Sequence, residues 1–560
     1  MPKPWVTLYG HVPDTLPITN RTIVDLLIER ARVAPTQPAI YYFDTEINWH
    51  TLVDRIRKLS AGFQNMGIKP GDRVGLMLQN LPAFVVVQFA LWWIGAVVVP
   101  LNVMYRTQEL VHHLGDSECT AVVVLESLTD RFDAVLGATS LQSIVTVDDE
   151  EDFAGDRPAF LPKPISVTKG THSYRDLLSS EPISTMPYQL SASDVAYLNY
   201  TSGTTGVAKG AMTTHGNLLY NAAVYGEWLH LGDGDVNVVF APLFHITGSV
   251  SGVAASIYAG IPMALLYRFD AGIALKTIER RRATFTVGAI TTYLAMMNHA
   301  DISRCDLSSL TKAYSGGAPV SPATIERFRS VTGQYIYNVY GLTESTSPAT
   351  MVPWQNEAPV DPESGALSVG IPVPGLDVKV VSLANRLQEQ PFGTAGELAL
   401  RGPQIVPGYW KRPDETAKAI QEGWFYTGDV AVMDEQGWVY IVDRVKDMID
   451  ASGYKVWPRE VEDALYLHPA VAEAAVVGVP DPYRGETVKA FVALRADQQA
   501  TTAEEIRLFV KERLATYKVP TSVEIVPEIP KTVSGKFLRR VLREQEIKHQ
   551  TDQPPNTSAQ

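Results

Sequence analysis

The chain has 560 residues, more than one hydrophobic core normally serves, so we expect a large body and at least one further domain. Its composition, 46% hydrophobic and 19% charged, is typical of a folded protein and excludes extensive disorder. A formal net charge of -13 excludes wholesale binding to nucleic acid, so a polyanionic ligand would have to meet a local positive patch.

The two ends of the chain and its most apolar stretch bear on its location. The N-terminal "MPKPWVTLYG" lacks the basic start and apolar core of a signal peptide, and the C-terminal "TSAQ" is no peroxisomal address, so a cytoplasmic protein is expected. Residues 83–99 are apolar enough to suggest a membrane span, but Gln88 and Gly95 interrupt them and Pro100 follows. We predict instead a buried helix that runs into a buried strand, and no transmembrane segment.

Helical and strand patterns alternate along the first part of the chain. Apolar residues recur at helical spacing over residues 51–66, and "DRVGLML", after a Pro-Gly turn, has the pattern of a strand. The alternation continues through "VNVVFAPL", "IPMALL", "ALKTIERRRA", "TFTVGAI" and "SPATIERFRS", where Ser321 and Pro322 make a good helix start. This order predicts an α/β body with mostly parallel strands.

The pattern changes twice later in the chain. After about Asp377, short alternating runs such as "VKVV" and "GELALRG", with frequent glycine, predict a smaller β-rich subdomain. Past "DRVKD", the strand-like runs "AEAAVVGV" and "VKAFVALR" and the helix-like "AEEIRLFVKERL" predict a separate small α+β domain. The end of the chain has the composition of a disordered tail.

One short segment has the composition of a phosphate-binding loop. Residues 200–210, "YTSGTTGVAKG", follow a strand-like run and combine glycines, hydroxyl side chains and Lys209. Glycines let backbone N–H groups converge on an anion, hydroxyls add donors, and the lysine supplies a positive charge. The segment is not a Walker P-loop, because Lys209 lies between Ala208 and Gly210 with no Ser or Thr after it. By itself, it is equally well explained as a surface linker.

Further segments follow this loop in a fixed order: "PLFHITG", "SGGAP", "YGLTES", "YTGDVAVMDEQGWVYIVDRVKDMIDASGYKV" and "PKTVSGKFLRR". Together with the loop they resemble the motifs of the adenylate-forming superfamily, specifically its acyl-CoA synthetases, over nearly the whole chain. The resemblance implies that a carboxylic acid is activated with ATP to an acyl adenylate and then transferred to coenzyme A. It implies a large N-terminal α/β body with its β-rich subdomain over residues 1–443, a hinge at 444–446, a small mobile α+β domain over 447–547 and a disordered tail at 548–560.

The resemblance assigns the phosphate and metal groups. The loop would bind the ATP phosphates through backbone donors, hydroxyls and one charge, supplied by Thr201, Ser202, Gly203, Thr204, Thr205 and Lys209. Glu344 in "YGLTES" matches the family's Mg²⁺ carboxylate, a hard oxygen ligand suited to a cation that bridges phosphates. Thr343 beside it would contact the α-phosphate. Without the other motifs, Glu344 would be interpreted as an acid near a helix start.

Adenosine requires a flat slot and an acceptor for the ribose hydroxyls. By resemblance, Tyr340 stacks on the base, Asp429 binds the ribose, and Arg444 lies near the ribose at the domain boundary. The "SGGAP" segment would let its backbone approach the base, through Gly316, Gly317 and Ala318. Taken alone, Asp429 would be interpreted as a turn residue and Arg444 as a surface ion-pair partner.

The resemblance assigns the acyl group to the segment around "PLFHITG". His245 matches a family histidine that lines the acyl pocket near the carboxylate, although a lone histidine between two apolar residues would be interpreted as a core residue. Small residues follow it and would leave an open channel for an extended chain, and "PLFHITGSVSGVAAS" contains no Asp or Glu. These features favour a nonpolar carboxylic acid over an amino acid.

The C-terminal region supplies the remaining groups by resemblance. Lys536 in "PKTVSGKFLRR" matches the catalytic lysine that bridges carboxylate and α-phosphate oxygens, and Lys446 in "DRVKD" matches the hinge. Gly453 and Lys455 in "SGYK" match the segment at the thioester-forming site, with Gly453 beside the pantetheine path. Asp450 stands where related luciferase-type oxygenases often carry a lysine, which argues against an oxygenase. Taken alone, Lys536 would be interpreted as a solvated surface lysine.

The predicted function is that of an AMP-forming acyl-CoA ligase for medium- or long-chain fatty acids that uses ATP, Mg²⁺ and coenzyme A. An aryl-acid CoA ligase of the cinnamate or benzoate type shares the motifs and stays open, as does a stand-alone acyl adenylating enzyme. A P-loop ATPase conflicts with the failed Walker match, and a catalytically silent binding protein conflicts with the filled catalytic positions. The expected partners are small molecules, not nucleic acid, and a homodimer stays open.

Overall fold

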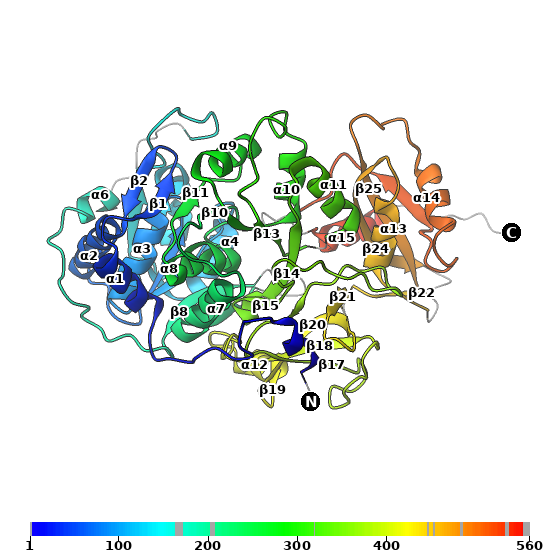
Figure 1. The fold of residues 1–560 in the computed structure, drawn as a ribbon, viewed down its shortest axis with the longest axis horizontal. Helices are drawn as coiled ribbons and strands as arrows, with labels where there is room; N and C mark the ends of the chain where they lie inside the picture. Colours follow the sequence, from blue (N-terminus) through cyan, green and yellow to red (C-terminus); the bar gives the residue numbers. More distant parts are fainter. Residues whose placement is uncertain are drawn as a thin grey trace.

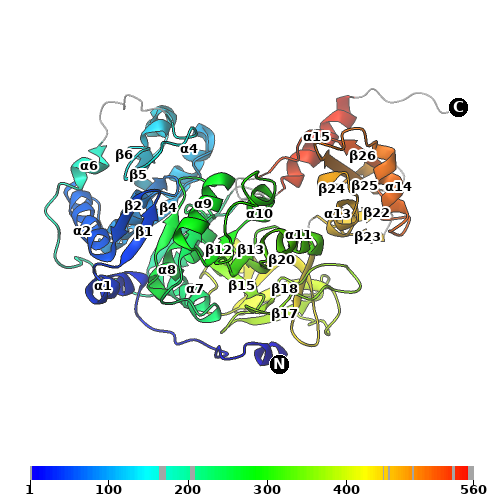
Figure 2. The same cartoon turned by 45° about the horizontal axis from the view of Figure 1, so that its top comes forward.

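The structure is a computed structural model of the chain, and it describes residues 3–162, 172–201, 208–318, 320–444, 447–451, 454–481, 485–531 and 537–552. Three parts follow one another along the sequence (Figures 1 and 2). A large body contains two mainly parallel sheets, a β-rich part lies beside the end of the second sheet, and a small C-terminal domain stands at one side in both views. The predicted α/β class, with a large N-terminal body and a small C-terminal domain, is confirmed.

A seven-stranded sheet forms the first half of the body. Its strands, in spatial order, are β7 (His172–Ser173), β6 (Ser143–Val147), β5 (Cys119–Leu125), β3 (Arg73–Met77), β4 (Val97–Pro100), β8 (Val195–Tyr200) and β9 (Gly210–Thr214). All neighbours are parallel except β8 and β9. The helix α3 (Pro82–Trp93) is buried along its whole length and leads into buried β4, as predicted for residues 83–99. In the described part of the chain, no helix is long and apolar enough to cross a membrane.

A nine-stranded sheet forms the second half of the body. Its strands, in spatial order, are β16 (Ile371–Pro372), β15 (Ser347–Met351), β14 (Ile336–Leu342), β13 (Lys312–Ser315), β12 (Phe285–Gly288), β10 (Asn237–Val239), β11 (Met263–Leu265), β1 (Pro38–Tyr42) and β2 (Thr45–Asn48). The strands from β14 to β1 are parallel, and antiparallel strands close both edges. The carboxyl ends of β10, β12, β13 and β14 therefore share one edge, which is where open α/β sheets bind ligands.

Helices connect the strands of the body, and the start and end of α11 follow from its local sequence. They include α1 (Ile23–Val33), α2 (Trp49–Asn65), α4 (Thr107–Asp116), α5 (Asp133–Leu136), α6 (Tyr174–Leu177), α7 (His215–Trp228), α8 (Ala255–Ala259), α9 (Ala271–Arg281), α10 (Ile290–Met297) and α11 (Pro322–Thr332). The start of α11 is as predicted, because the Ser321 side chain accepts a hydrogen bond from the Thr324 N–H and Pro322 takes the first helical position. Gly333, with φ of 75°, ends this helix in the left-handed conformation.

The predicted β-rich subdomain is an antiparallel sheet (yellow in Figure 1). It contains β17 (Asp377–Val381), β18 (Gly396–Arg401), β19 (Ile420–Gln421), β20 (Trp424–Met433) and β21 (Val439–Arg444), and α12 (Pro413–Ala419) precedes β19. In the β20–β21 ladder, Asp429 lies directly opposite Arg444. This pairing places Asp429, which is predicted to bind the ribose, beside Arg444, the first residue of the expected hinge range 444–446.

The C-terminal domain has the predicted α+β composition. It contains β22 (Ile449–Ala451), β23 (Tyr454–Val456), α13 (Pro458–Tyr466), β24 (Val471–Asp481), β25 (Gly485–Leu494), α14 (Ala503–Lys511), β26 (Ser522–Ile525) and α15 (Arg539–Asp552). The Thr502 side chain accepts from the Glu505 N–H and so starts α14 with a capping box. Because α15 runs to Asp552, residue 548, where the tail was expected to begin, lies inside this helix.

Candidate active site

Loops at the carboxyl ends of the parallel strands carry the predicted nucleotide residues. Thr201 directly follows β8, Gly316 directly follows β13, and Thr343 directly follows β14. His245 lies a few residues beyond the end of β10. Segments that are far apart in the sequence thus meet along one side of the body, because the strand order, not the chain order, decides which loops are neighbours.

Several predicted site residues lie outside the residues that the structure describes. They are Ser202, Gly203, Thr204 and Thr205 of the loop, Lys446 of the hinge, Gly453, and Lys536. For Arg444 and Lys455 the structure describes the backbone, which lies in β21 and β23. Their predicted roles stay predictions.

The phosphate loop is closed at its base by strand pairing. The Thr201 N–H donates to the Lys209 carbonyl at 2.9 Å, continuing the β8–β9 ladder. The Lys209 ammonium forms an ion pair with Glu415 of α12 and lies 5.3 Å from the centroid of the Tyr409 ring. The side chains of both ion-pair partners are 34% exposed, so this ion pair contributes little to stability.

Glu344 is held by two hydrogen bonds from the segment that precedes α12. Its Oε1 accepts a hydrogen bond of 2.7 Å from the Tyr409 hydroxyl, and its carbonyl accepts one of 2.9 Å from the Val406 N–H. Burial raises the pKa of Tyr409 and the charge of Glu344 raises it further, so the phenol stays protonated and donates. Thr343 opens the short 3-10 turn that carries Glu344.

The donor set around Glu344 fits a magnesium ion that is shared with a nucleotide. Among the described residues there is no group of three or more His, Cys, Asp or Glu side chains that could hold a metal ion. Mg²⁺ commonly binds one or two carboxylates and takes its other ligands from substrate phosphates and water. A single carboxylate near the phosphate loop is therefore sufficient for a cation that arrives with ATP.

Tyr340 and Asp429 form a pair that spans the body and the β-rich subdomain. The Tyr340 hydroxyl donates to Asp429 Oδ2 at 2.6 Å, although the two residues are 89 positions apart. Asp429 is only 2% exposed, and its own N–H donates to the Thr427 hydroxyl at 3.1 Å. The structure thus joins the residue predicted to stack on the base with the residue predicted to bind the ribose.

Glycines near this pair are required by close backbone contacts. A Cβ at Gly316 would lie 2.7 Å from the Val339 carbonyl oxygen, and Gly317 has φ of 81°. A Cβ at Gly341 would lie 1.6 Å from the Ser347 carbonyl oxygen, so only glycine fits there. Ala318 completes the segment after β13. Sequence reasoning missed Gly341, although it sits inside the quoted "YGLTES" motif.

The segment after His245 is closely packed. The Thr247 N–H donates to His245 Nδ1 at 3.3 Å, and residues Gly248–Ala254 form a fully buried π-helical stretch, η3. A Cβ at Gly248 would lie 2.2 Å from the Pro242 carbonyl oxygen, and one at Gly252 would lie 2.8 Å from Val239. Gly248 and Gly252 therefore allow close packing of this stretch against Pro242 and Val239. Such π-helical turns are frequent at functional sites.

A charged cluster at the start of α15 was not predicted. The Arg539 guanidinium faces Glu462 of α13, Asp443 of β21 and Asp447, at 2.6, 3.7 and 3.7 Å. The Arg459 N–H, in the first turn of α13, donates to Asp443 Oδ2 at 3.0 Å. The only sequence signal was the basic "FLRR" run, which does not reveal that one arginine, 18% exposed, is enclosed by carboxylates.

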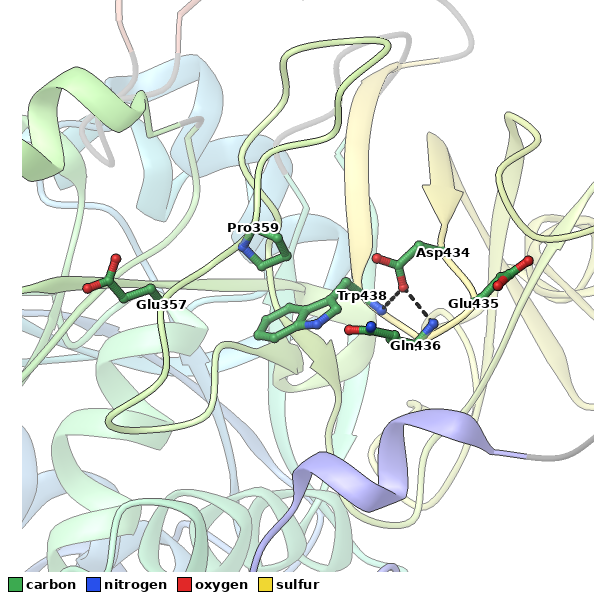
Figure 3. A pocket seen from close by; sticks show the side chains of 6 residues that line it. All are labelled: Glu357, Pro359, Asp434, Glu435, Gln436 and Trp438. Atoms are coloured by element: carbon green, nitrogen blue, oxygen red, sulfur yellow. Dashed lines mark hydrogen bonds between the residues drawn. The ribbon is translucent and has the colours of Figure 1, made fainter.

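A separate hollow of about 420 Å³ lies between the β20–β21 turn and the loop before β16 (Figure 3). It is lined by Glu357, Pro359, Asp434, Glu435, Gln436 and Trp438. Asp434 Oδ1 accepts hydrogen bonds of 2.9 Å from the Gln436 and Trp438 N–H groups, which is the usual role of aspartate in a turn. None of the predicted site residues lines this hollow.

Comparison with known proteins agrees with this geometry. Residues 27–410 match the family AMP-binding enzyme, and residues 460–536 match the AMP-binding enzyme C-terminal domain. The chain is 35% identical to a long-chain-fatty-acid–CoA ligase of Bacillus subtilis (strain 168), over 98% of this chain and 99% of that protein. It is 35% identical to a feruloyl-CoA synthase of Amycolatopsis sp, over 92% of this chain and 97% of that protein.

A solved structure with nucleotide and metal has the same fold. The O-succinylbenzoate coenzyme A synthetase from Bacillus subtilis, in complex with ATP and magnesium ion, is 26% identical and superposes with a TM-score of 0.78. The match covers 94% of this chain and 100% of that chain. The fold and the family matches thus define an AMP-forming acid–thiol ligase.

The chain belongs to the adenylate-forming, AMP-binding enzyme family. Within that family it is an ATP-dependent acid–CoA ligase, which forms an acyl adenylate and then a coenzyme A thioester.

Proposed function

We propose that the acid is a medium- or long-chain fatty acid. The main support for this proposal comes from residues 242–256. This segment has no Asp, Glu, Lys or Arg and contains the buried stretch η3. A charged or strongly polar group on the far end of the acid would find no partner there, so an apolar body is favoured. The fatty-acid ligase at 35% identity supports this proposal, whereas the feruloyl-CoA synthase at 35% supports the aryl alternative.

A substrate panel tests the proposal. Pyrophosphate release is measured with and without coenzyme A, for straight-chain acids from butyric to stearic and for benzoic, cinnamic and ferulic acids. We expect a fatty acid to give the highest kcat/KM. An aryl acid with the highest kcat/KM would overturn the fatty-acid proposal, and acyl adenylate that never reacts with coenzyme A would favour a stand-alone adenylating enzyme.

The proposed roles in adenylation follow from charge. The attacking carboxylate and the ATP phosphates are all anionic, so the site must offset negative charge with preorganised donors. Lys209 and the loop donors would bind the β- and γ-phosphates, and Thr343 would contact the α-phosphate. Glu344 would hold Mg²⁺, which supplies positive charge between phosphate oxygens when bound. His245 would line the pocket near the carboxylate of the acid.

The proposed nucleotide contacts use the Tyr340–Asp429 pair. The buried Asp429 carboxylate would accept from the ribose hydroxyls, and the Tyr340 bond to it fixes its orientation. Arg444, opposite Asp429 in the ladder, would lie near the ribose. The backbone of Gly316, Gly317 and Ala318 would border the base.

We also propose two orientations of the C-terminal domain. Lys536 and the segment with Gly453 and Lys455 belong to one domain and would not face one acyl adenylate in a single orientation, so the domain should swing about Lys446 between half-reactions. Lys536→Ala should slow adenylation by ~10²-fold or more, while preformed acyl adenylate still reacts with coenzyme A. Lys446→Pro should do the reverse, since proline restricts φ at the hinge. Equal loss of both steps in both variants would contradict this mechanism.

A further inference from the structure

The segment from Val406 to Glu415 contacts two residues of the proposed site and has no role assigned so far. Its Tyr409 hydroxyl binds the Glu344 carboxylate, and its Glu415 binds the Lys209 ammonium. Lys209 precedes β9 of one sheet and Glu344 follows β14 of the other, and they serve different parts of MgATP in the proposed function. One short segment therefore reaches both the proposed metal ligand and the proposed phosphate ligand.

The backbone of Tyr409 is fixed on both sides. Tyr409 forms a β-bridge with Ala211 of β9, and the neighbouring Trp410 N–H donates to the Gly210 carbonyl at 2.8 Å. On the other side, the Tyr409 N–H donates to the Thr416 hydroxyl of α12 at 3.0 Å. The ring is 8% exposed, so its position is set by packing and not by solvent. The hydroxyl is therefore presented at a defined place.

The hydroxyl and the ring of Tyr409 contact opposite charges. The hydroxyl donates to Glu344 Oε1 at 2.7 Å, and the Val406 N–H holds the Glu344 carbonyl at 2.9 Å. The Lys209 ammonium lies 5.3 Å from the ring centroid, within the range of a cation–π contact. A carboxylate that must bind a cation gains from a fixed rotamer, because ordering it in advance lowers the cost of binding.

We propose that Tyr409 is a positioning residue for MgATP, which orients Glu344 through its hydroxyl and Lys209 through its ring. The inference rests on the proposed roles of Glu344 and Lys209. Glu415 forms an ion pair with Lys209 until the nucleotide phosphates replace it.

The test is Tyr409→Phe, which removes the hydroxyl and keeps the ring. Binding of MgATP, and of ATP with EDTA, is measured by titration calorimetry, and KM and kcat are measured across a magnesium series. We expect MgATP affinity to fall about 10-fold or more, as for loss of a hydrogen bond to a charged group, with metal-free ATP affinity changed less than about twofold. KM should approach the wild-type value at high magnesium, with kcat nearly unchanged.

The matched control is Tyr267→Phe. The Tyr267 hydroxyl also donates to a carboxylate, Asp149, at 2.7 Å, but neither residue belongs to the proposed site. This variant should leave both affinities unchanged. Equal loss of MgATP and metal-free ATP binding in Tyr409→Phe, or no loss of either, would overturn the inference.

Glu344→Gln separates the inference from the proposed function. If Tyr409 acts through Glu344, Tyr409→Phe should add little to the magnesium dependence of the Glu344→Gln variant in a double-mutant cycle. Additive effects would overturn the positioning role. If Glu344→Gln changes the magnesium dependence and Tyr409→Phe does not, the inference on Tyr409 is overturned, but the metal role of Glu344 stands. Unaltered dependence in Glu344→Gln would overturn the metal role and the inference with it.

Discussion

We expect the stability of the C-terminal domain to depend on Arg539. Its Nη2 and Nε donate to the two Glu462 oxygens at 2.6 and 3.1 Å, and its Nη1 lies 3.7 Å from both Asp443 and Asp447. The Glu462 and Asp443 side chains are 4% and 1% exposed, so these charges are nearly out of water. Burial by itself lowers the pKa of Arg539, but the carboxylates, Glu462 first, more than offset this and raise it, so the cation persists.

Arg539→Met keeps an unbranched apolar stem and removes the charge. The buried Glu462 then loses two charge-assisted hydrogen bonds, and Asp443 and Asp447 each lose one ion-pair partner, although Asp447 keeps Arg543 at 3.6 Å. Breaking a buried ion pair from one side costs about 3–5 kcal/mol, because the remaining charge is left uncompensated. We therefore expect the free energy of opening the C-terminal domain to fall by about 3–5 kcal/mol, which corresponds to roughly two to four orders of magnitude in hydrogen exchange.

Hydrogen exchange of the paired β24 and β25 amides measures this opening directly. Arg540→Met is the control, because the Arg540 side chain is 63% exposed and pairs with an exposed glutamate, so its loss should change exchange little. Adding Glu462→Gln to Arg539→Met should recover part of the lost stability, because it removes the uncompensated charge. The glutamine can still accept from the Val476 N–H, which lies 2.8 Å from Glu462 Oε1 in the native structure. Exchange equal in the two methionine variants, or no recovery by glutamine, would refute the reasoning.

Three further outcomes are expected. Gly341→Ala should abolish nucleotide binding or soluble expression, because its Cβ would meet the Ser347 carbonyl at 1.6 Å; wild-type activity would contradict this. Burial lowers the pKa of His215 from 6.5 to about 4, so protonation of the unfolded chain should reduce the free energy of unfolding as pH falls from 6.5 towards 4, by up to about 3 kcal/mol. His215→Phe, which retains the ring contact with Trp92, should flatten that pH dependence in denaturant titrations, and an unchanged slope would contradict the assignment. Asp429→Asn should raise the KM for ATP several-fold with a smaller effect on kcat, because a neutral amide accepts more weakly from hydroxyls; a change in kcat alone would exclude the ribose role.

Local patterns determined the elements and the family. The apolar run over residues 83–99 forms a buried helix and a buried strand. Pro82 starts the helix, and Gln88 and Gly95 interrupt the run before it is long enough to span a membrane. Ser321 and Pro322 start α11 through a side-chain cap and a first-position proline, which both lie within one helical turn. The ordered motifs identified the adenylate-forming family, which the family matches confirm. Each of these conclusions depends on residues that are close in the sequence or on motif order.

Only the tertiary structure determined which side chains of the site contact one another. Tyr409 and Glu344 are 65 positions apart, and they meet because the segment after β18 lies against β9 and the end of β14. The close approach of the π-helical stretch η3 to Pro242 and Val239 likewise depends on tertiary packing, which the sequence pattern did not predict. Periodicity reports which face of an element is apolar, but it does not report which distant element covers that face. Burial of Arg539 among three carboxylates, like the Tyr409 contacts, depends on strand order and chain crossing, which no local pattern encodes.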